Sequence, residues 1–550
     1  MAWGKSTPAD PEATARDLLA KAASTGTLVV LPFRKFGDAE CVALCAQLAA
    51  CDLNELQASG HAIGEVGAQA LGGWLGDERC ALRRIAIGDA SFGAAGLRAL
   101  ATGMRGGRCP LHSLDLSLKG LKGSQSGDAL AALLASCTAL RELSLARNPS
   151  LGSDGLAPLA MTGVLASPLG TTLLSLDLSD AGLDDTALGL LADAASSPID
   201  RGALQALQTL KLSHNPLIGT DGGGSTIELE ALLRSVPSVR ALHLESCALG
   251  HAAAASIGRA VGGGNGLGGA PPPLAELCEL RLGENSQLLR SSGPPSASEA
   301  SKRASMPRAF IHSAIPTRAE YEAALQLPPE EGAAIERAAA ERAVAAGRAD
   351  GSDGPLGNAG ADVCEPGGLS AAASVLLDGI RGAPKLSTLS LAACAAGDSV
   401  AAALAGRARA PWTSPLTSLD MRSNALSAKG ARSLLRLPQL ESLALFDNPQ
   451  VGMAGGGDGS SLASGLDELP PMSPLRHLDL GACGIGIDLL RAFSDALTSG
   501  SAPQLRTLEL FGNGTDDETR VAWLDALAGL REARPDIDIA WKEPAGDAAP

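Results

Sequence analysis

The residues Leu140-Arg-Glu-Leu-Ser-Leu-Ala-Arg-Asn148 decide the fold, because their spacing recurs along almost the whole chain. We number the nine residues of each copy as positions 1 to 9, with Leu at positions 1, 4 and 6. Thirteen copies begin at Leu53, Leu82, Leu111, Leu140, Leu173, Leu207, Val239, Leu277, Leu386, Leu416, Leu440, Leu475 and Leu505. A repeat of about this length is typical of a solenoid, whose units bury their apolar faces only against one another.

The pattern of each copy predicts a short strand. Leu143 and Leu145 share one face of an extended chain and Ser144 lies on the other, because side chains alternate along a strand. Parallel stacking of the copies therefore buries the leucines in one core and leaves position 5 on an open face. Asn148 stands where the chain bends away, and its amide can satisfy backbone groups that the bend exposes.

A second pattern after the strands predicts helices. Apolar residues and glycines spaced by four occur in Ile63-x3-Gly67-x3-Leu71, Phe92-x3-Gly96-x3-Leu100 and Leu426-x3-Gly430-x3-Leu434. This spacing places one apolar stripe along a helix. We expect each glycine to let its helix begin close to a neighbour.

The strand and helix patterns together resemble the ribonuclease-inhibitor-like class of leucine-rich repeats, over roughly residues 28–541 apart from one insertion. The resemblance implies an α/β horseshoe, with a parallel β-sheet on the concave side and α-helices on the convex side. That class alternates Asn and Cys at position 9. Here position 9 holds Asn148, Ala181, Asn215, Cys247, Asn285, Cys394, Asn424, Asn448, Cys483 and Asn513, preceded by His61, Ala90 and Lys119.

Departures from the repeat predict the domain boundaries. We expect a flexible flank over residues 1–27 and a capping unit over 28–52, read from Leu28-x-x-Leu31-x-Phe33. Repeats 1–8 follow over 53–285, then an insertion over 286–367, then the helix of repeat 8 and repeats 9–13 over 368–530. Residues 531–550 would form a cap strand, Ile537-x-Ile539-x-Trp541, and a tail.

The insertion begins with Ser291–Arg308, which has the composition of a disordered segment. Thr317 and Glu320 match a capping box, so a helix could begin there, and a second helical stretch covers Pro329–Arg348. The insertion holds the single tyrosine, Tyr321, and is either a tolerated loop or a docking arm. Shorter insertions are expected around Thr220–Glu230 and Gly455–Asp467.

Composition excludes several function classes. A formal charge of −16, without a Lys/Arg stripe and with only 2% aromatic residues, argues against a nucleic-acid partner. No apolar stretch is long enough to cross a bilayer, so we expect no membrane association and a soluble, cytoplasmic, monomeric protein. The eleven cysteines lack a Cys-x-x-Cys pair, which favours reduced thiols. Cys51, Cys80 and Cys109 should stack in adjacent repeats, either as small loop residues or with a redox or metal role.

A search for catalytic patterns gives no candidate. Gly4-Lys5-Ser6 lacks the upstream glycine of a phosphate-binding loop, and no Gly-x-Ser-x-Gly elbow lies between a strand and a helix. The seven histidines have no metal-ligand spacing on one helix. We therefore expect no catalytic residue, no cofactor, no metal site and no enzymatic activity.

The open face is the first candidate binding surface. Position 5 carries basic or potentially basic side chains in the middle of the array and acidic ones on both sides. The candidate partner-binding residues are Asp115, Asp177, Lys211, His243, Arg281, Asp420, Asp479 and Glu509, with Tyr321 from the insertion. This order is either a binding surface or the accidental charge order of a solvated sheet. In the first case His243 would make the charge of the centre depend on pH near neutrality.

The sequence thus predicts a non-catalytic scaffold that binds a protein partner on the concave face, on the 286–367 insertion, or on both. The alternative is a regulator of a small GTPase, because the repeats resemble those of Ran GTPase-activating proteins. Those proteins usually add a strongly acidic tail, which the residues Arg531–Pro550 do not provide.

Overall fold

The leucine columns form the buried face of one parallel sheet, whose fifteen strands follow chain order from β1 to β15. The computed structural model describes residues 10–48, 53–104, 109–165, 168–196, 204–219, 225–262, 272–289, 369–406, 414–453, 462–467, 473–513 and 519–541. The chain divides into one unit of residues 1–291 with 365–550 and a second unit of 292–364, which lies outside the described residues.

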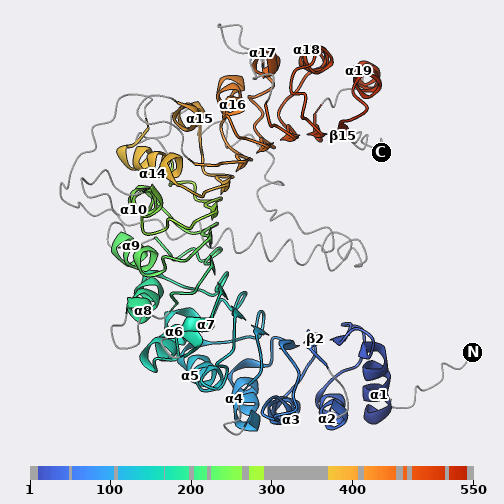
Figure 1. The fold of residues 1–550 in the computed structure, drawn as a ribbon, viewed down its shortest axis with the longest axis vertical. Helices are drawn as coiled ribbons and strands as arrows, with labels where there is room; N and C mark the ends of the chain where they lie inside the picture. Colours follow the sequence, from blue (N-terminus) through green and yellow to red (C-terminus); the bar gives the residue numbers. More distant parts are fainter. Residues whose placement is uncertain are drawn as a thin grey trace, which may run out of the picture. The chain divides into compact units, whose positions relative to one another are not determined.

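The strands of the first unit are short and evenly spaced. They are β1 (Thr27–Val29), β2 (Glu55–Ser59), β3 (Arg84–Gly88), β4 (Ser113–Asp115), β5 (Glu142–Ser144), β6 (Ser175–Asp177), β7 (Thr209–Lys211), β8 (Ala241–His243), β9 (Glu279–Arg281), β10 (Thr388–Ser390), β11 (Ser418–Asp420), β12 (Ser442–Ala444), β13 (His477–Asp479), β14 (Thr507–Glu509) and β15 (Asp538–Ala540). They line the inner side of the arc of the first unit (Figure 1).

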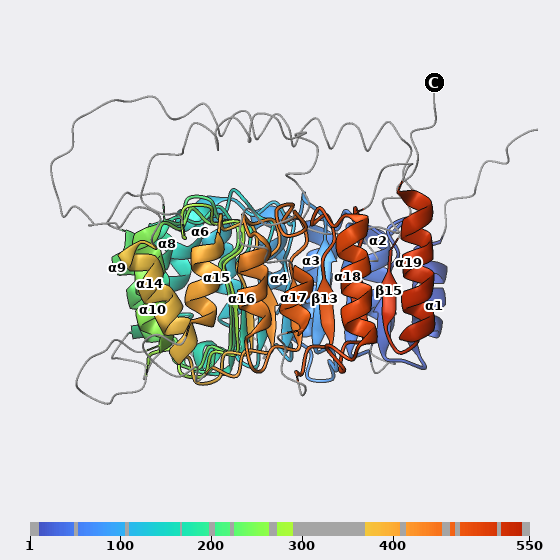
Figure 2. The same ribbon diagram turned by 90° about the horizontal axis from the view of Figure 1, so that it is seen from above.

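Helices cover the other face of the sheet and lie side by side along the outside of the arc (Figures 1 and 2). They are α1 (Pro11–Ala22), α2 (Asp38–Gln47), α3 (Glu65–Leu75), α4 (Gly93–Met104), α5 (Gly123–Leu134), α6 (Gly152–Met161), α7 (Pro168–Thr172), α8 (Asp185–Ser196), α9 (Ser225–Ser235), α10 (His251–Gly262), α14 (Ala371–Gly382), α15 (Asp398–Ala405), α16 (Ala428–Leu435), α17 (Leu462–Asp467), α18 (Ile487–Thr498) and α19 (Arg520–Ala533).

The strand register confirms the predicted leucine columns. Position 4 of one repeat pairs with position 4 of the next, as in Leu114 with Leu143 and Leu143 with Leu176. Position 5 pairs in the same way, from Gln57 with Ala86 to Asp479 with Glu509. Leucines at positions 4 and 6 are buried against the helices, so the solenoid has one continuous apolar core.

Position 9 carries the hydrogen bonds that join consecutive bends. Asn148 Oδ1 accepts from the backbone amides of Lys119 (3.0 Å) and Leu121 (3.1 Å) in the preceding repeat. Its Nδ2 donates to the carbonyl oxygens of Leu116, Leu145 and Ala146 at 2.8–3.1 Å. The buried amide thus satisfies groups of two repeats, as the sequence predicts.

Other residues at position 9 replace only part of this network. The thiols of Cys394 and Cys483 each donate one bond, at 3.0 Å, to the position 6 carbonyl of the preceding repeat. His61 Nε2 makes the corresponding contact with the carbonyl oxygen of Val30 at 3.1 Å. Lys119 is 2% exposed, and its Nζ reaches Ser59 Oγ at 3.2 Å. The looser early repeats therefore keep the fold through different side chains.

Glycines allow several helices to pack closely against their neighbours. A Cβ at Gly67 would lie 2.6 Å from Asp38 Oδ1 of the neighbouring helix, and one at Gly430 would lie 2.2 Å from Asp398 Oδ1. These two glycines confirm the predicted close approach, whereas Gly96 is crowded by Phe92 of its own turn. The Asp38 carboxylate in turn accepts from the Gly64 and Gly67 amides at the start of α3.

The array continues across the long gap between repeats 8 and 9. β9 pairs with β10 through Leu280 and Leu389 in the same register as every other neighbour. Helix α14 lies against α10, where a Cβ at Gly379 would be 2.2 Å from the Gly258 carbonyl oxygen. The helix of repeat 8 is therefore α14, near the predicted position, although 89 residues, 282–370, lie between the end of β9 and the start of α14.

Two predictions for the N-terminus are wrong. Residues 11–22 of the predicted flexible flank form α1, which buries Ala15, Leu18 and Leu19. Leu28 pairs with Leu56 and so occupies position 4, not position 1. Phe33 is consequently outside the core and 82% exposed. Leu28, Leu31 and Phe33 have the spacing of positions 1, 4 and 6, but the true repeat is displaced from this spacing by three residues.

At the other end, β15 confirms the predicted cap strand, and Trp541 stacks on the buried Trp523 of α19. The predicted shorter insertions are narrower than expected, since α9 begins at Ser225 and α17 at Leu462. Tyr321 and the two helices predicted within the insertion lie outside the described residues.

Candidate protein-binding face

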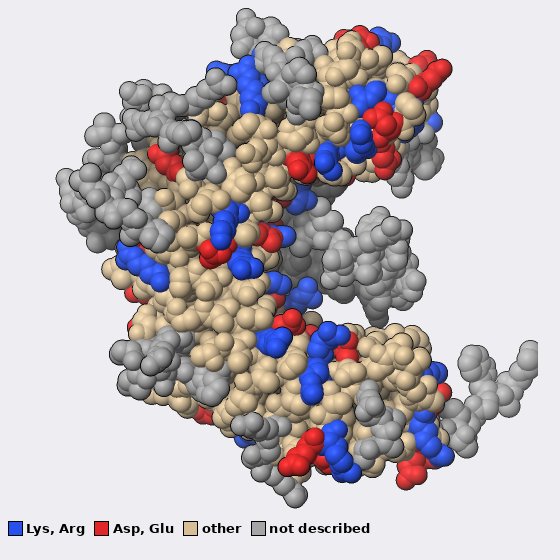
Figure 3. Space-filling model, viewed as in Figure 1, with Lys and Arg blue, Asp and Glu red and all other residues tan. Residues whose placement is uncertain are grey.

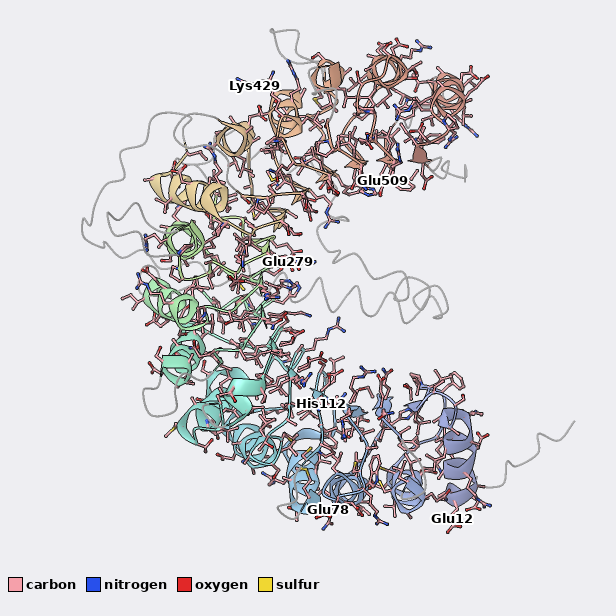
Figure 4. The ribbon with its side chains drawn as sticks, in the orientation of Figure 1. Glu12, Glu78, His112, Glu279, Lys429 and Glu509 are labelled. Atoms are coloured by element: carbon pink, nitrogen blue, oxygen red, sulfur yellow. The ribbon has the colours of Figure 1, made fainter. Side chains whose placement is uncertain are left out.

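The open face of the sheet carries positions 3, 5 and 7 of each repeat, because positions 4 and 6 point into the core. Glu279 and Glu509 lie on this inner side of the arc, whereas Glu12, Glu78 and Lys429 lie on the helical side (Figure 4). All eight described candidates from the sequence belong to position 5 and are brought into one column by the strand pairing.

Four aspartates of this column have a structural role that the sequence analysis missed. Each accepts, through Oδ1, the backbone amide two residues further on, at the end of its strand. The bonds are Asp115 to Ser117 (2.8 Å), Asp177 to Ser179 (3.0 Å), Asp420 to Arg422 (3.1 Å) and Asp479 to Gly481 (2.9 Å). These carboxylates stabilise the bend and leave Oδ2 for other contacts.

The predicted positive centre is offset by acidic residues of position 5 itself and of position 3. Lys211 Nζ lies 3.4 Å from Asp177 Oδ2, and Arg281 Nε donates to Glu279 Oε1 at 2.6 Å. His243 Nε2 also lies 3.3 Å from Glu279 Oε1. Figure 3 correspondingly shows basic and acidic side chains next to one another along the inner margin of the arc. Position 5 alone did not reveal the part played by Glu279, which belongs to position 3.

The imidazole of His243 is largely shielded from water. Burial lowers the pKa of His243 below its usual value of 6.5, and the nearby Arg281 lowers it further. Glu279 opposes this shift only in part. The ring is therefore neutral at neutral pH, and its change of charge falls at lower pH than the sequence suggested.

The C-terminal part of the face combines aromatic and acidic groups. Phe446 and Phe511, at position 7, are 37% and 39% exposed. Gly481 lies between them, and a Cβ there would be 2.5 Å from the Phe446 ring. Burial raises the pKa of the nearby Asp479 carboxyl, and Glu509 adds further negative charge. We call Phe446, Phe511, Asp479 and Glu509 the aromatic–acidic patch.

The cysteines of the described chain are all free thiols. Cys80 and Cys109 are buried in adjacent repeats, and Cys51 lies outside the described residues. Burial raises the pKa of the Cys80 thiol to about 11, which keeps it protonated at neutral pH. No group of three or more metal-binding side chains occurs in the described part of the chain. Among these same residues, no helix is both long and apolar enough to cross a bilayer.

Comparisons with known sequences give matches to parts of the chain. A family model described as leucine-rich repeat matches residues 136–160 and 414–435. Tonsoku-like protein of Mus musculus is 39% identical over 128 residues, which are 23% of this chain and 8% of that protein. Ribonuclease inhibitor of Sus scrofa is 31% identical over 218 residues, 39% of this chain and 44% of the inhibitor. The chain therefore spans less than half of either relative.

Solved structures align along most of the chain at low similarity. The TLR13–ssRNA13 complex has a TM-score of 0.40 and 14% identity, covering 92% of this chain and 47% of that one. An internalin from Listeria monocytogenes has a TM-score of 0.36 and 14% identity, covering 98% and 95%. With its repeated strand register, its position 9 network and these sequence matches, the chain is a leucine-rich repeat protein distantly homologous to ribonuclease inhibitor and to part of Tonsoku-like protein.

Proposed function

We propose that this protein is a non-catalytic scaffold that binds a protein partner on its concave face, with the aromatic–acidic patch as the main contact. The supporting observation is the exposure of Phe446 and Phe511 in a protein with only seven phenylalanines. An aromatic side chain exposed on a rigid sheet offers a large contact area at a low entropic cost, and such residues often dominate binding energy.

The surroundings of the two rings support the same function. Position 5 supplies Asp479 and Glu509 from adjacent strands, paired in register. Arg422 is held against Asp420 by a two-point contact, with Nη2 2.8 Å from Oδ2. Such a border of fixed charges around apolar side chains gives a binding surface specificity. Lys211, His243 and Arg281 would meet the same partner nearer the middle of the array.

Quantitative cross-linking capture from cells that express the protein tests this proposal. The double variant Phe446→Ala with Phe511→Ala should reduce capture of the main partner at least tenfold. The control is Leu524→Ala on the outer helix α19, which is 43% exposed. The double variant and the Leu524→Ala control should each have the same unfolding temperature as the wild-type protein. Equal capture by the double variant and the control would contradict the proposal.

The 286–367 insertion is proposed as a second contact, which the same experiment tests with a protein that lacks it. The exchange of Lys211 and Arg281 for Glu tests the middle of the face. Regulation of a small GTPase stays an alternative prediction, and a GTP-turnover assay with added protein distinguishes it from simple binding. The predicted cytoplasmic location and monomeric state are likewise left to experiment.

A further inference from the structure

Position 2 of three consecutive repeats forms a column of basic side chains at the edge where the strands begin. The residues are Arg83, His112 and Arg141. The His112 amide donates to the Arg83 carbonyl oxygen at 2.7 Å, and the Arg141 amide donates to that of His112 at 2.8 Å. Neighbouring members are thus one strand spacing apart, about 4.8 Å. We call these three residues the basic ladder.

Among the described residues, the ladder has none of the acidic ion-pair partners that many other cations of this protein have. Arg83 Nη1 donates to the carbonyl oxygens of Leu82 and Pro110, each at 3.4 Å. Arg141 is exposed and makes no ion pair with any described residue. Burial lowers the pKa of His112, and the nearby Arg141 and Arg83 lower it further. The two arginines therefore disfavour the protonated form of the imidazole between them in the free protein.

Position 2 is different in the C-terminal half. Arg506 Nη1 lies 2.9 Å from Asp536 Oδ2, and Arg476 Nε lies 3.8 Å from Glu441 Oε2. The chain has an excess of acidic residues, with a formal charge of −16, so the lack of partners at the ladder is not a shortage of carboxylates. Two arginines on either side of an imidazole, with no ion-pair partner among the described residues, are arranged as a receptor for an anion.

We infer that the basic ladder binds the phosphate group of a phosphorylated serine or threonine in the protein partner. Two guanidinium groups can each give paired hydrogen bonds to a phosphate, and clusters of arginine commonly recognise phosphorylated segments. The imidazole between them adds a third donor. This inference rests on the proposed scaffold function, because it specifies one chemical feature of the segment that is bound.

The partial burial of the ladder favours a phosphorylated side chain of a protein over the lipid headgroups of a membrane as the source of the phosphate. Arg83 and His112 are half-buried, and only Arg141 is exposed. A flat bilayer would reach Arg141 alone, whereas a phosphate on a narrow side chain can approach all three. The doubly negative phosphate would also restore the charge on His112.

NMR detection of the His112 imidazole in the full-length protein tests the inference, with His112→Gln used to assign the signal. The probe is the peptide acetyl-Ala-phosphoSer-Ala-amide, compared with its unphosphorylated form. The phosphorylated peptide should raise the pKa of His112, because a nearby anion favours the protonated ring. Arg141→Gln should weaken peptide binding roughly tenfold. The matched control Arg506→Gln removes a paired arginine from the same position and should leave binding unchanged.

Three results would overturn the inference. One is an equal response to both peptides, and another is unchanged binding by Arg141→Gln. The third is Arg141-dependent binding to vesicles that contain a phosphoinositide, without any response to the phosphopeptide. Each differs from failure of the scaffold proposal, which is measured by partner capture through Phe446 and Phe511. Loss of the ladder interaction would leave that contact intact.

Discussion

The position 9 network makes a quantitative prediction for Asn148→Ala. The substitution removes five hydrogen bonds, but their loss is not equally costly. The Ala146 carbonyl oxygen keeps a bond from the Leu118 amide, whereas the amides of Lys119 and Leu121 lose the Asn148 acceptor. Each buried amide without a partner costs about 1–3 kcal/mol. The free energy of unfolding should therefore fall by roughly 2–6 kcal/mol.

Guanidinium chloride unfolding, followed by circular dichroism, measures this loss. Asn148→Cys should be intermediate, because the thiols of Cys394 and Cys483 each restore one of the five bonds in their own repeats. The control is Asn54→Ala, the same substitution at an exposed side chain. The reasoning fails if Asn148→Ala is as stable as Asn54→Ala, or if the Cys variant is no more stable than the Ala variant.

Three further predictions concern packing, charge and the insertion. Gly379→Ala should lower the free energy of unfolding by about 1–3 kcal/mol, because its Cβ would overlap the Gly258 carbonyl oxygen. Gly529→Ala, with no atom within 4 Å of its Cβ, should instead raise it by about 0.5–1 kcal/mol in the same denaturant assay. Burial lowers the pKa of Lys119, so urea unfolding at several pH values should show wild-type stability rising as pH increases from that lowered pKa to about 10.5. Lys119→Met should lack this rise, and an unchanged pH profile would contradict the assignment. Replacing residues 290–368 with a short flexible linker should preserve both the far-ultraviolet circular dichroism of the repeats and cooperative thermal unfolding, because β9 already pairs with β10. A loss of cooperativity would show that the insertion stabilises the array.

The sequence predicts the regular parts of this protein well because their physical causes are local and repeated. Alternation of Leu143, Ser144 and Leu145 determines which side chains face the core, and the strand register confirms it. Asn148 was likewise predicted from the need to satisfy a buried bend. The N-terminal capping unit was predicted in the wrong register because Leu28, Leu31 and Phe33 have the leucine spacing of a repeat, whereas the strand β1 ends at Val29.

The candidate binding face was predicted less completely, because contacts between columns depend on distances that spacing does not give. Glu279 compensates the charge of Arg281 on its own strand, and Asp177 compensates that of Lys211 from the neighbouring strand. The exposed Phe446 and Phe511 belong to position 7, where glycine and alanine also occur, so no residue pattern identified them. The basic ladder could have been found from position 2, since Arg83, His112 and Arg141 follow one another in consecutive copies.

The hydrogen bonds of position 9 have a direction. Asn148, Asn215 and Asn424 each complete the bend of the repeat before their own, so those bends depend on the repeat that follows. Among the described residues, the bend at Asn513 is contacted by a different group, since Trp541 Nε1 donates to the Asn513 carbonyl oxygen at 3.3 Å. The two ends of the array are therefore not interchangeable. Removing a repeat with Asn at position 9 from the C-terminal end leaves the backbone amides of the preceding bend without their acceptor. Removing a repeat from the N-terminal end instead leaves the asparagine side chain of the next repeat without these backbone partners.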